Sequence, residues 1–379
     1  MSEQLGASFD LLAGWQRGGV YVEHEGLGIA TGPGSVVGPD DVAAALRDGP
    51  DGVVAAGALP FAGSGSLLIA ASQVRRVDPF VTARIGPPVP PELVTGLIPA
   101  EAFGDAALVE APTPIAYAGA VQEAARRVRA GELRKVVLAR TIEVAAGRPL
   151  EARRLAHRLR AVDPHAYTFI APADAGVLVG ASPELLVSRH GTEVRANPLA
   201  GSAARAGDPT QDRANAELLA ASAKDHDEHA VVVEAVAAVL APVCETLTWD
   251  PEPVLRETPN VWHLSTRFRG RLRAPAPSAL DLALALHPTP AVGGTPTEAA
   301  LALLHQLEGF DRGSYAGPVG WVDAAGDGEW AIALRCALLR DDRATLYAGA
   351  GIVGASDPQA EVDETDRKFR AFLDALRWG

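Results

Sequence analysis

The chain has 379 residues, 48% of them hydrophobic, which is enough for one large or two medium domains. Its net charge of −13, with no cluster of basic residues, argues against a nucleic-acid-binding protein. No apolar run reaches the length of a membrane span and the start MSEQLGASFD does not resemble a secretion signal, so we expect a cytoplasmic protein. Cys244 and Cys336 are too few for a disulfide framework or a zinc site.

The first 110 residues show short strand-like runs and no chemical motif. The runs are Gly19–Glu23, Gly52–Ala58 and Ser66–Ala71, separated by Gly and Pro. Residues 84–115 contain the Pro-rich segment GPPVPPELV, which we expect to be an extended connection over the surface.

A clearer pattern begins at Tyr117. Helical periodicity covers Ala118–Ala130, and Gly131 ends it. The run KVVLARTIEV, from Lys135, predicts a strand on which Lys135 shares a face with Val137, Ala139 and Thr141. A second helix is expected at Leu150–Ala161.

The middle of the chain predicts several strands around one helix. GVLVGA and LLVSRHGTEVRA are strand-like, with a turn at His190 and Gly191, and PLAGSAAR is expected to be a loop. The helix of residues 221–240 follows, and then strand-like runs at Thr246–Trp249 and Trp262–Leu272. The Gly-rich loop in LHPTPAVGG precedes a helix whose start, with Thr295 and Glu298, matches a capping box.

Two hairpins and a helix close the sequence. The hairpins are expected to turn at Gly326–Gly328 and at Asp341–Asp342. The helix begins near Pro358, with Ser356 or Asp357 as its N-cap and a core stripe of Phe369, Phe372, Leu373 and Leu376. Strands joined by hairpins, with helices between them, favour a mainly antiparallel α+β fold.

An acidic residue lies on the apolar face of the helix at 221–240. Val232, Val236, Val239 and Leu240 have helical spacing, and Glu228 lies one turn before Val232 on the same face. A buried carboxylate needs a partner, and Mg2+ prefers such oxygen ligands. The alternative is a polar helix entry whose acids face water.

The start of the last helix offers a second acidic group. Glu361, Glu364 and Lys368 project from one side of the helix. We therefore predict that this helix and the one bearing Glu228 hold one Mg2+ between them. The alternative is a solvated helix start whose acids complement the helix dipole.

Lys135 and Glu184 are candidates for acid–base chemistry. A lysine inside a sheet can act as a general base, although a lysine at a strand end can also extend to water. Glu184, in ASPELL, lies at the entry of an apolar strand, which suits a general acid.

Glycines and one arginine suggest an anion site. Backbone N–H groups near Gly201 and Ser202, Gly293 and Gly294, and Gly349 and Gly351 could bind a carboxylate, or these glycines could serve tight turns and close packing. Arg335, an isolated charge in ALRCALL, needs a carboxylate from a ligand or from a structural Asp or Glu.

The ordered motifs resemble the chorismate-binding family, which includes isochorismate synthases, salicylate synthases and the large subunits of anthranilate and aminodeoxychorismate synthases. The motifs span about residues 115–379 and are RKVVLAR, SPELLVSR, PLAGSAAR, KDHDEH, VWHLST, HPTPAVGG, ALRCALL, YAGAGIVGASDP and EVDETDRK. The resemblance implies one domain over residues 1–379, with large antiparallel sheets packed between helices and a variable part at 1–110. It also implies chorismate as the substrate and Mg2+ as the cofactor.

The resemblance assigns a role to each candidate residue. Lys135 matches the general base that activates water, and Glu184 the general acid. Glu228 and Glu364, with Glu361 beside them, match the Mg2+ ligands. Substrate contacts are implied for Gly201, Ser202, His263, Tyr315, Arg335, Gly349, Gly351 and Lys368. For His263 the alternative is a core histidine.

One residue decides the branch of the family. Ala291 in HPTPAVGG stands where ammonia-using and salicylate-forming relatives usually carry Thr, so the loop resembles that of isochorismate synthases. We expect a monomer without a glutaminase subunit. A salicylate synthase and a catalytically silent chorismate-binding partner are the alternatives, and the resemblance leaves open a role in menaquinone, siderophore or salicylate synthesis.

Overall fold

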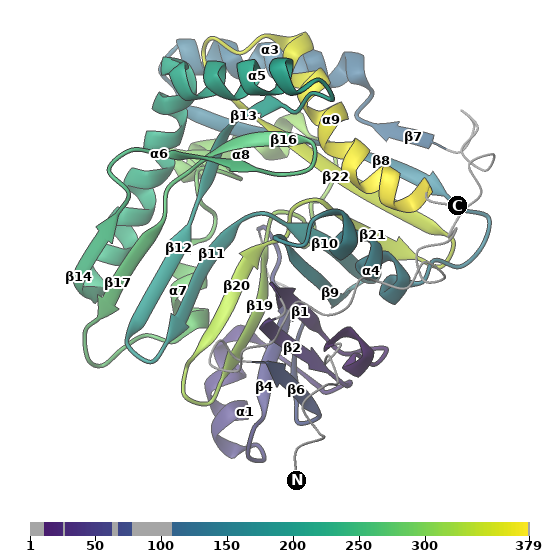
Figure 1. Cartoon of the computed structure of the whole chain (residues 1–379), viewed down its shortest axis with the longest axis vertical. Coiled ribbons are helices and arrows are strands. Elements are labelled where there is room, and N and C mark those ends of the chain that lie inside the picture. Colours follow the sequence, from purple (N-terminus) through teal and green to yellow (C-terminus); the bar gives the residue numbers. More distant parts are fainter. Residues whose placement is uncertain (1–10, 26, 63–66, 78–107, 378–379) are drawn as a thin grey trace.

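Two large sheets and a small one form the framework of the protein (Figure 1). The computed structural model describes residues 11–25, 27–62, 67–77 and 108–377. Most of the Pro-rich connection expected at 84–115 lies outside the described residues. None of the described helices combines the length and apolar character needed to cross a membrane.

The first sheet has ten strands among the described residues. In spatial order they are β18 (Gly294–Thr295), β8 (Lys135–Ala145), β22 (Arg343–Ile352), β21 (Cys336–Arg340), β10 (Gly176–Ser182), β9 (Tyr167–Ala173), β1 (Tyr21–His24), β2 (Leu27–Thr31) and β6 (Val74–Val77), and β7 (Leu108–Ala111) also pairs with β8.

In the part of the chain that the structure describes, the second sheet has nine strands and the third has three. The second has the order β14 (Cys244–Trp249), β17 (Phe268–Leu272), β12 (Glu193–Asn197), β11 (Leu185–His190), β20 (Gly328–Ile332), β19 (Pro318–Asp323), β4 (Val54–Ala58), β5 (Leu67–Ala71) and β3 (Ser35–Val37). The third has the order β13 (Leu199–Ala204), β16 (Val261–Ser265) and β15 (Val254–Glu257). Every strand pair among the described residues is antiparallel, which confirms the predicted α+β fold.

Helices pack against the sheets and enclose two hydrophobic cores. The helices are α1 (Val42–Asp48), α3 (Pro114–Arg129), α4 (Ala152–Val162), α5 (Pro209–Ala221), α6 (Ala223–Leu240), α7 (Ala279–Leu286), α8 (Thr297–Leu307) and α9 (Pro358–Arg377), with short 3-10 turns at Leu11–Gly14, Pro39–Asp41 and Ala241–Val243. The larger core joins residues of both large sheets, such as Phe169 and Trp330. The second core lies where α4 and α9 cover the ten-stranded sheet.

The two helices that bear the predicted acids have the predicted faces. In α6, Val232, Val236 and Leu240 are buried, and Glu228 on the same stripe is only 8% exposed. This burial excludes the alternative of a solvated Glu228. In α9, the Asp357 side chain accepts a hydrogen bond from the Ala360 N–H, so Asp357 is the N-cap. The predicted core stripe of α9 is buried as well.

Three local predictions were wrong. PLAGSAAR is not a loop, because residues 199–204 form β13 and pair with β16, with a bulge at Gly201. The run at 262–272 is divided between β16 and β17, which belong to different sheets. The capping box at Thr295 does not form, since Thr295 lies in β18, where it pairs with Lys135 of β8, and Pro296 is the N-cap of the helix. A capping box lies instead at Ser278 and Asp281, at the start of α7.

Arg140 fastens α9 to the ten-stranded sheet. Its side chain is fully buried on β8, and its guanidinium donates hydrogen bonds to the Thr365 hydroxyl, at 2.8 Å, and to the Asp366 carboxylate. It also lies over the rings of Tyr117 and Phe369. Because Thr365 and Asp366 lie between Glu364 and Lys368, this contact sets the position of the acidic face of α9.

We expect Arg140→Met to lower the free energy of unfolding by about 2–4 kcal/mol, because the hydrogen-bonding groups around the buried guanidinium lose their partner. Urea denaturation would measure the loss. The matched control is Arg343→Met, which removes an exposed pair with Glu143 on the neighbouring strand and should cost less than about 1 kcal/mol. Equal losses in the two variants would contradict the anchoring role of Arg140.

Candidate active site

All of the residues to which the family resemblance assigns a role line one cavity of about 270 Å3. Its walls come from β8, β13, α6, β16, β22 and α9 and from the loops beside them. The predicted residues in the lining are Lys135, Glu184, Gly201, Ser202, Glu228, His263, Ala291, Tyr315, Arg335, Gly349, Gly351, Glu361, Glu364 and Lys368. Gly294, by contrast, serves close packing, because a Cβ there would lie 2.4 Å from the Lys135 carbonyl oxygen.

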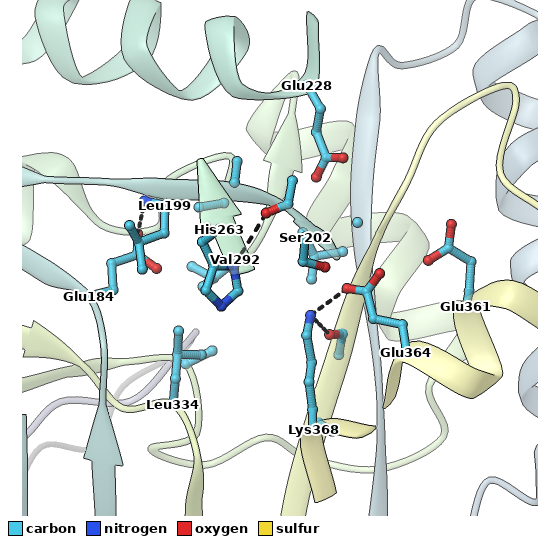
Figure 2. A pocket seen from close by; sticks show the side chains of 18 of the residues that line it. Glu184, Leu199, Ser202, Glu228, His263, Val292, Leu334, Glu361, Glu364 and Lys368 are labelled. Carbon is cyan, nitrogen blue, oxygen red and sulfur yellow. Dashed lines mark hydrogen bonds and ion pairs between the residues drawn. The ribbon is translucent and has the colours of Figure 1, made fainter. Parts of the chain in front are cut away.

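Three carboxylates converge at one end of the cavity. Figure 2 shows Glu228 pointing from α6 into the space that Glu361 and Glu364 face from α9. Burial and the neighbouring Glu364 raise the pKa of Glu361 to about 7. Burial also acts to raise the pKa of Glu364, but Lys368 and Ser202 hold that pKa at about 2. The site thus contains more negative charge than its surroundings readily accommodate.

The donor set at this end fits Mg2+. Carboxylate oxygens are the hard ligands that this ion prefers, and the repulsion at Glu361 is what a divalent cation would relieve. Among the described residues, no three His, Cys, Asp or Glu side chains lie close enough together to hold a metal ion in the metal-free arrangement. The carboxylates are engaged with lysines instead, since Glu228 pairs with Lys135 at 2.8 Å and Glu364 with Lys368 at 2.6 Å.

The ion pair of Lys135 and Glu228 can form only because residue 351 is a glycine, which has no side chain. Lys135 is 2% exposed at the start of β8, so it does not extend to water as a strand-end lysine could. A Cβ at Gly351, on the adjacent strand β22, would lie 2.3 Å from Glu228 Oε1 and 3.0 Å from Lys135 Cε. Gly351 therefore leaves room for the ion pair.

Glu184 is a buried acid in another part of the cavity (Figure 2). It lies between β10 and β11 and is 3% exposed, and the only hydrogen bond to its carboxylate among the described residues comes from the Leu199 N–H at 3.5 Å. Burial raises the pKa of Glu184 to about 8. The side chain is therefore mostly protonated at neutral pH and can donate a proton.

Arg335 and His263 form a cationic, hydrogen-bonding wall. Burial lowers the pKa of His263 to about 3, so the ring is neutral. Its Nε2 can accept from Arg335 Nη2 at 3.3 Å, which leaves Nδ1 to donate to the Gly201 carbonyl oxygen at 3.3 Å. Within the described part of the chain no Asp or Glu forms an ion pair with Arg335, so a structural carboxylate does not fill that role. The guanidinium is available to an anionic ligand.

Sequence reasoning missed the buried pair of Arg312 and Glu308. Glu308 accepts from the Ala139 N–H at 2.8 Å, and Arg312 donates to the carbonyl oxygens of Val137 at 2.6 Å and Val292 at 2.8 Å. These bonds fasten the loop that carries Ala291 to the edge of β8. No local pattern distinguishes this pair from a surface i,i+4 pair.

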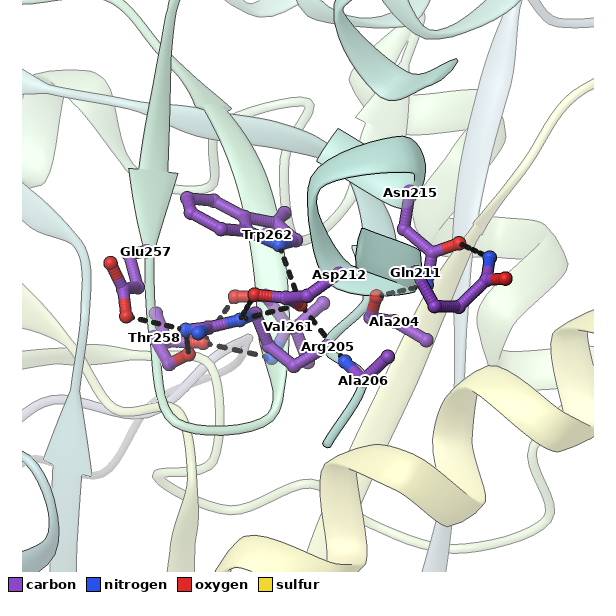
Figure 3. Close-up of polar contacts among 10 residues, drawn as sticks. All are labelled: Ala204, Arg205, Ala206, Gln211, Asp212, Asn215, Glu257, Thr258, Val261 and Trp262. Atoms are coloured by element: carbon purple, nitrogen blue, oxygen red, sulfur yellow. Dashed lines mark hydrogen bonds and ion pairs between the residues drawn. The ribbon is translucent and has the colours of Figure 1, made fainter. Parts of the chain in front are cut away.

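A second network holds β13 in place (Figure 3). Arg205, just after this strand, donates to Asp212 on α5 at 2.9 Å and to Glu257 on β15 at 2.7 Å, and its guanidinium lies 4.6 Å from the ring centre of Trp262. Ser202 on β13 and His263 on β16 are paired in register. The network therefore supports the two strands that bring Ser202 and His263 to the cavity.

Lys224 is a further cavity residue that the sequence reasoning missed. It lies in the first turn of α6, and its Nζ is 3.8 Å from Glu361 Oε1. The available signal was composition, because the chain contains only three lysines, Lys135, Lys224 and Lys368.

Comparisons with known proteins give a consistent result. A family model described as chorismate binding enzyme matches residues 100–377. MenF of Mycobacterium tuberculosis is 53% identical over 255 residues, which are 65% of this chain and 68% of that protein. The isochorismate synthase DhbC of Bacillus subtilis is 46% identical over 272 residues, which are 70% of this chain and 68% of that protein.

A solved structure agrees over almost the whole chain. MenF, the menaquinone-specific isochorismate synthase of Escherichia coli, has a TM-score of 0.81 and 25% sequence identity, and the match covers 98% of this chain and 92% of that one. The similarity therefore extends beyond residues 100–377, to described strands that precede residue 78 and belong to both large sheets.

We expect Gly351→Ala to separate Lys135 from Glu228 without unfolding the protein, because the atoms displaced by the new Cβ belong to flexible side chains. A crystal structure of the variant should show the Nζ–Oε1 distance increased by about 1 Å or more, and the free energy of unfolding should change by less than about 2 kcal/mol. An unchanged ion pair would contradict this account of Gly351.

Proposed function

Since this chain belongs to the family of chorismate-binding enzymes, we propose that it is an isochorismate synthase, which converts chorismate to isochorismate. The observation that supports the proposal most directly is the presence of a buried lysine and a protonated acid in one cavity. Lys135 and Glu184 line the same cavity, and the pKa of Glu184 is raised to about 8 by burial. Relatives at 46% and 25% identity carry the same name.

In the proposed reaction one water molecule adds a hydroxyl at C2 of the ring, and the C4 hydroxyl leaves as another water molecule. In this step the uncharged form of Lys135 Nζ takes a proton from a water molecule while the oxygen of that water bonds to C2 of the ring. The ring double bonds shift, the C4–O bond breaks, and Glu184 gives its proton to the departing hydroxyl, which leaves as water. Glu228, which pairs with the charged Lys135 at 2.8 Å in the metal-free protein, can stabilise the ammonium that this step forms again. No atoms are gained or lost overall.

Two regions of the cavity suit the two carboxylates of chorismate. We assign the enolpyruvyl carboxylate to Arg335, with Lys368 and Tyr315 nearby, because the Arg335 guanidinium has no ion-pair partner among the described residues. We assign the ring carboxylate to the end where Glu228, Glu361 and Glu364 would bind Mg2+. When bound there, the ion would supply positive charge that holds this carboxylate and draws electron density from the ring.

Ala291 and Lys135 suit water as the nucleophile. The small side chain of Ala291 resembles that of isochorismate synthases, and its loop is held rigidly by Arg312. A cytoplasmic monomer without a glutaminase subunit stays our expectation. We also expect the product to serve menaquinone or siderophore synthesis.

Purified protein given chorismate and Mg2+ should yield isochorismate as the main product, and EDTA should abolish the reaction. Lys135→Ala and Glu184→Gln should each lower kcat by about 10²- to 10⁴-fold, the range for loss of a general base or acid. Product chromatography would measure both. Arg134→Ala, an exposed neighbour of Lys135, is the matched control and should retain activity. Salicylate and pyruvate as main products, or no turnover at all, would overturn the proposal.

The pH dependence should carry the signature of Glu184. The carboxyl must be protonated to act as the acid, and its raised pKa of about 8 keeps it so at lower pH. The value of kcat/KM should therefore fall as pH rises through about 8, and the residual activity of Glu184→Gln should lack this decline. A wild-type profile that stays flat from pH 7 to 9.5 would exclude Glu184 as the proton donor.

A further inference from the structure

Lysine is confined to the active site of this protein. The 379 residues include 31 arginines but only three lysines, Lys135, Lys224 and Lys368. All three line the cavity, and each pairs with a different one of the three carboxylates. Lys135 and Lys368 have roles in the proposed reaction, and Lys224 has none. The distribution suggests that these positions require lysine specifically.

The geometry of Lys224 is that of a loosely held counter-ion. Its Nζ lies 3.8 Å from Glu361 Oε1, farther than the 2.8 Å and 2.6 Å of the other two pairs. The lysine side chain is 43% exposed, whereas that of Glu361 is 6% exposed. Lys224 lines both the inner cavity and a more open groove of about 900 Å3 beside α6. It can therefore withdraw into solvent, and Glu361 cannot.

The chemistry of lysine and arginine explains the choice. An arginine holds a carboxylate through a planar fork of donors, and the chain uses such contacts as permanent links, as in Arg312 with Glu308 and Arg205 with Asp212. A lysine is a single charge on a flexible stem, so it neutralises a carboxylate without a second directional bond. A cation that must later release the Glu361 carboxylate is therefore better provided by a lysine than by an arginine.

We propose that Lys224 is a displaceable counter-ion, which neutralises Glu361 in the metal-free protein and releases it when a divalent cation binds. The inference rests on the proposed Mg2+ site. Helix α6 then has two roles at the metal site. Glu228 is a metal ligand, and Lys224, one turn earlier, pairs with Glu361 of α9 until the metal binds. Lys224 is thus a positioning residue that competes with the metal.

Two substitutions should shift metal affinity in opposite directions. Lys224→Met removes the competing charge, so the Kd for Mg2+ should fall about two- to fivefold, the range for a partly exposed ion pair. Lys224→Arg places a firmer partner on Glu361, so the Kd should rise by a similar factor. Calorimetric titration of the chorismate-free protein with Mg2+ would measure both, and the metal-free Lys224→Met protein should also melt at a lower temperature than the wild type.

A matched control distinguishes the contact of Lys224 with Glu361 from the effect of removing any positive charge from this groove. Arg134 pairs with Glu234 in the same groove and does not contact Glu361 in the described structure, so Arg134→Met should leave the Kd within about twofold. An unchanged Kd in Lys224→Met, with a raised KM for chorismate, would overturn the inference and make Lys224 a substrate-binding residue. Weaker Mg2+ binding by Lys224→Met would overturn it also. Failure of the wild type to bind Mg2+ would instead refute the metal site itself.

Discussion

The repulsion among three carboxylates in one cavity is the constraint on which the site depends. Glu228, Glu361 and Glu364 face the same space, and burial together with Glu364 raises the pKa of Glu361 to about 7. Such a cluster is stable only if cations neutralise it, because an unpaired buried charge is costly. The lysines serve this purpose in the metal-free protein, and the proposed Mg2+ would take over part of it. The same negative charge that is costly to bury would therefore favour the binding of a cation.

The fold must hold the two acidic helices in place against this repulsion. Arg140 fastens α9 to β8, and β8 also carries Lys135. On the other edge of β8, Glu308 and Arg312 fix the loop of Ala291, while Arg205 supports the strands of Ser202 and His263. These links are buried or partly buried and use arginine, whose several donors fix geometry. Arginine links thus hold the elements around the cavity in place, and the carboxylates inside the cavity pair with lysines.

Two glutamates of the cavity differ in protonation because their environments differ. Glu184 and Glu364 are the same amino acid in one cavity, yet the pKa of the first is raised to about 8 and that of the second held at about 2. Burial acts on both, but Glu364 has Lys368 and Ser202 beside it, whereas the Glu184 carboxylate receives one long hydrogen bond, from a backbone N–H. A single cavity thus holds a protonated carboxyl at one place and a charged carboxylate at another.

The sequence by itself determined the features that follow from local periodicity and from ordered motifs. Helix α6 with Glu228 on its buried stripe, helix α9 with its acids, and the strand of Lys135 all appear where the spacing of apolar residues predicts them. Only the tertiary structure decided which elements pair. The small residues of β13 have no strand period, and the chain around 266 shows no signal for a change of sheet. The contacts of Lys135 with Glu228 and of Lys224 with Glu361 join residues far apart in the chain. Residue type and spacing are local properties, whereas the partner of a buried charge depends on which distant segments the hydrophobic core brings together.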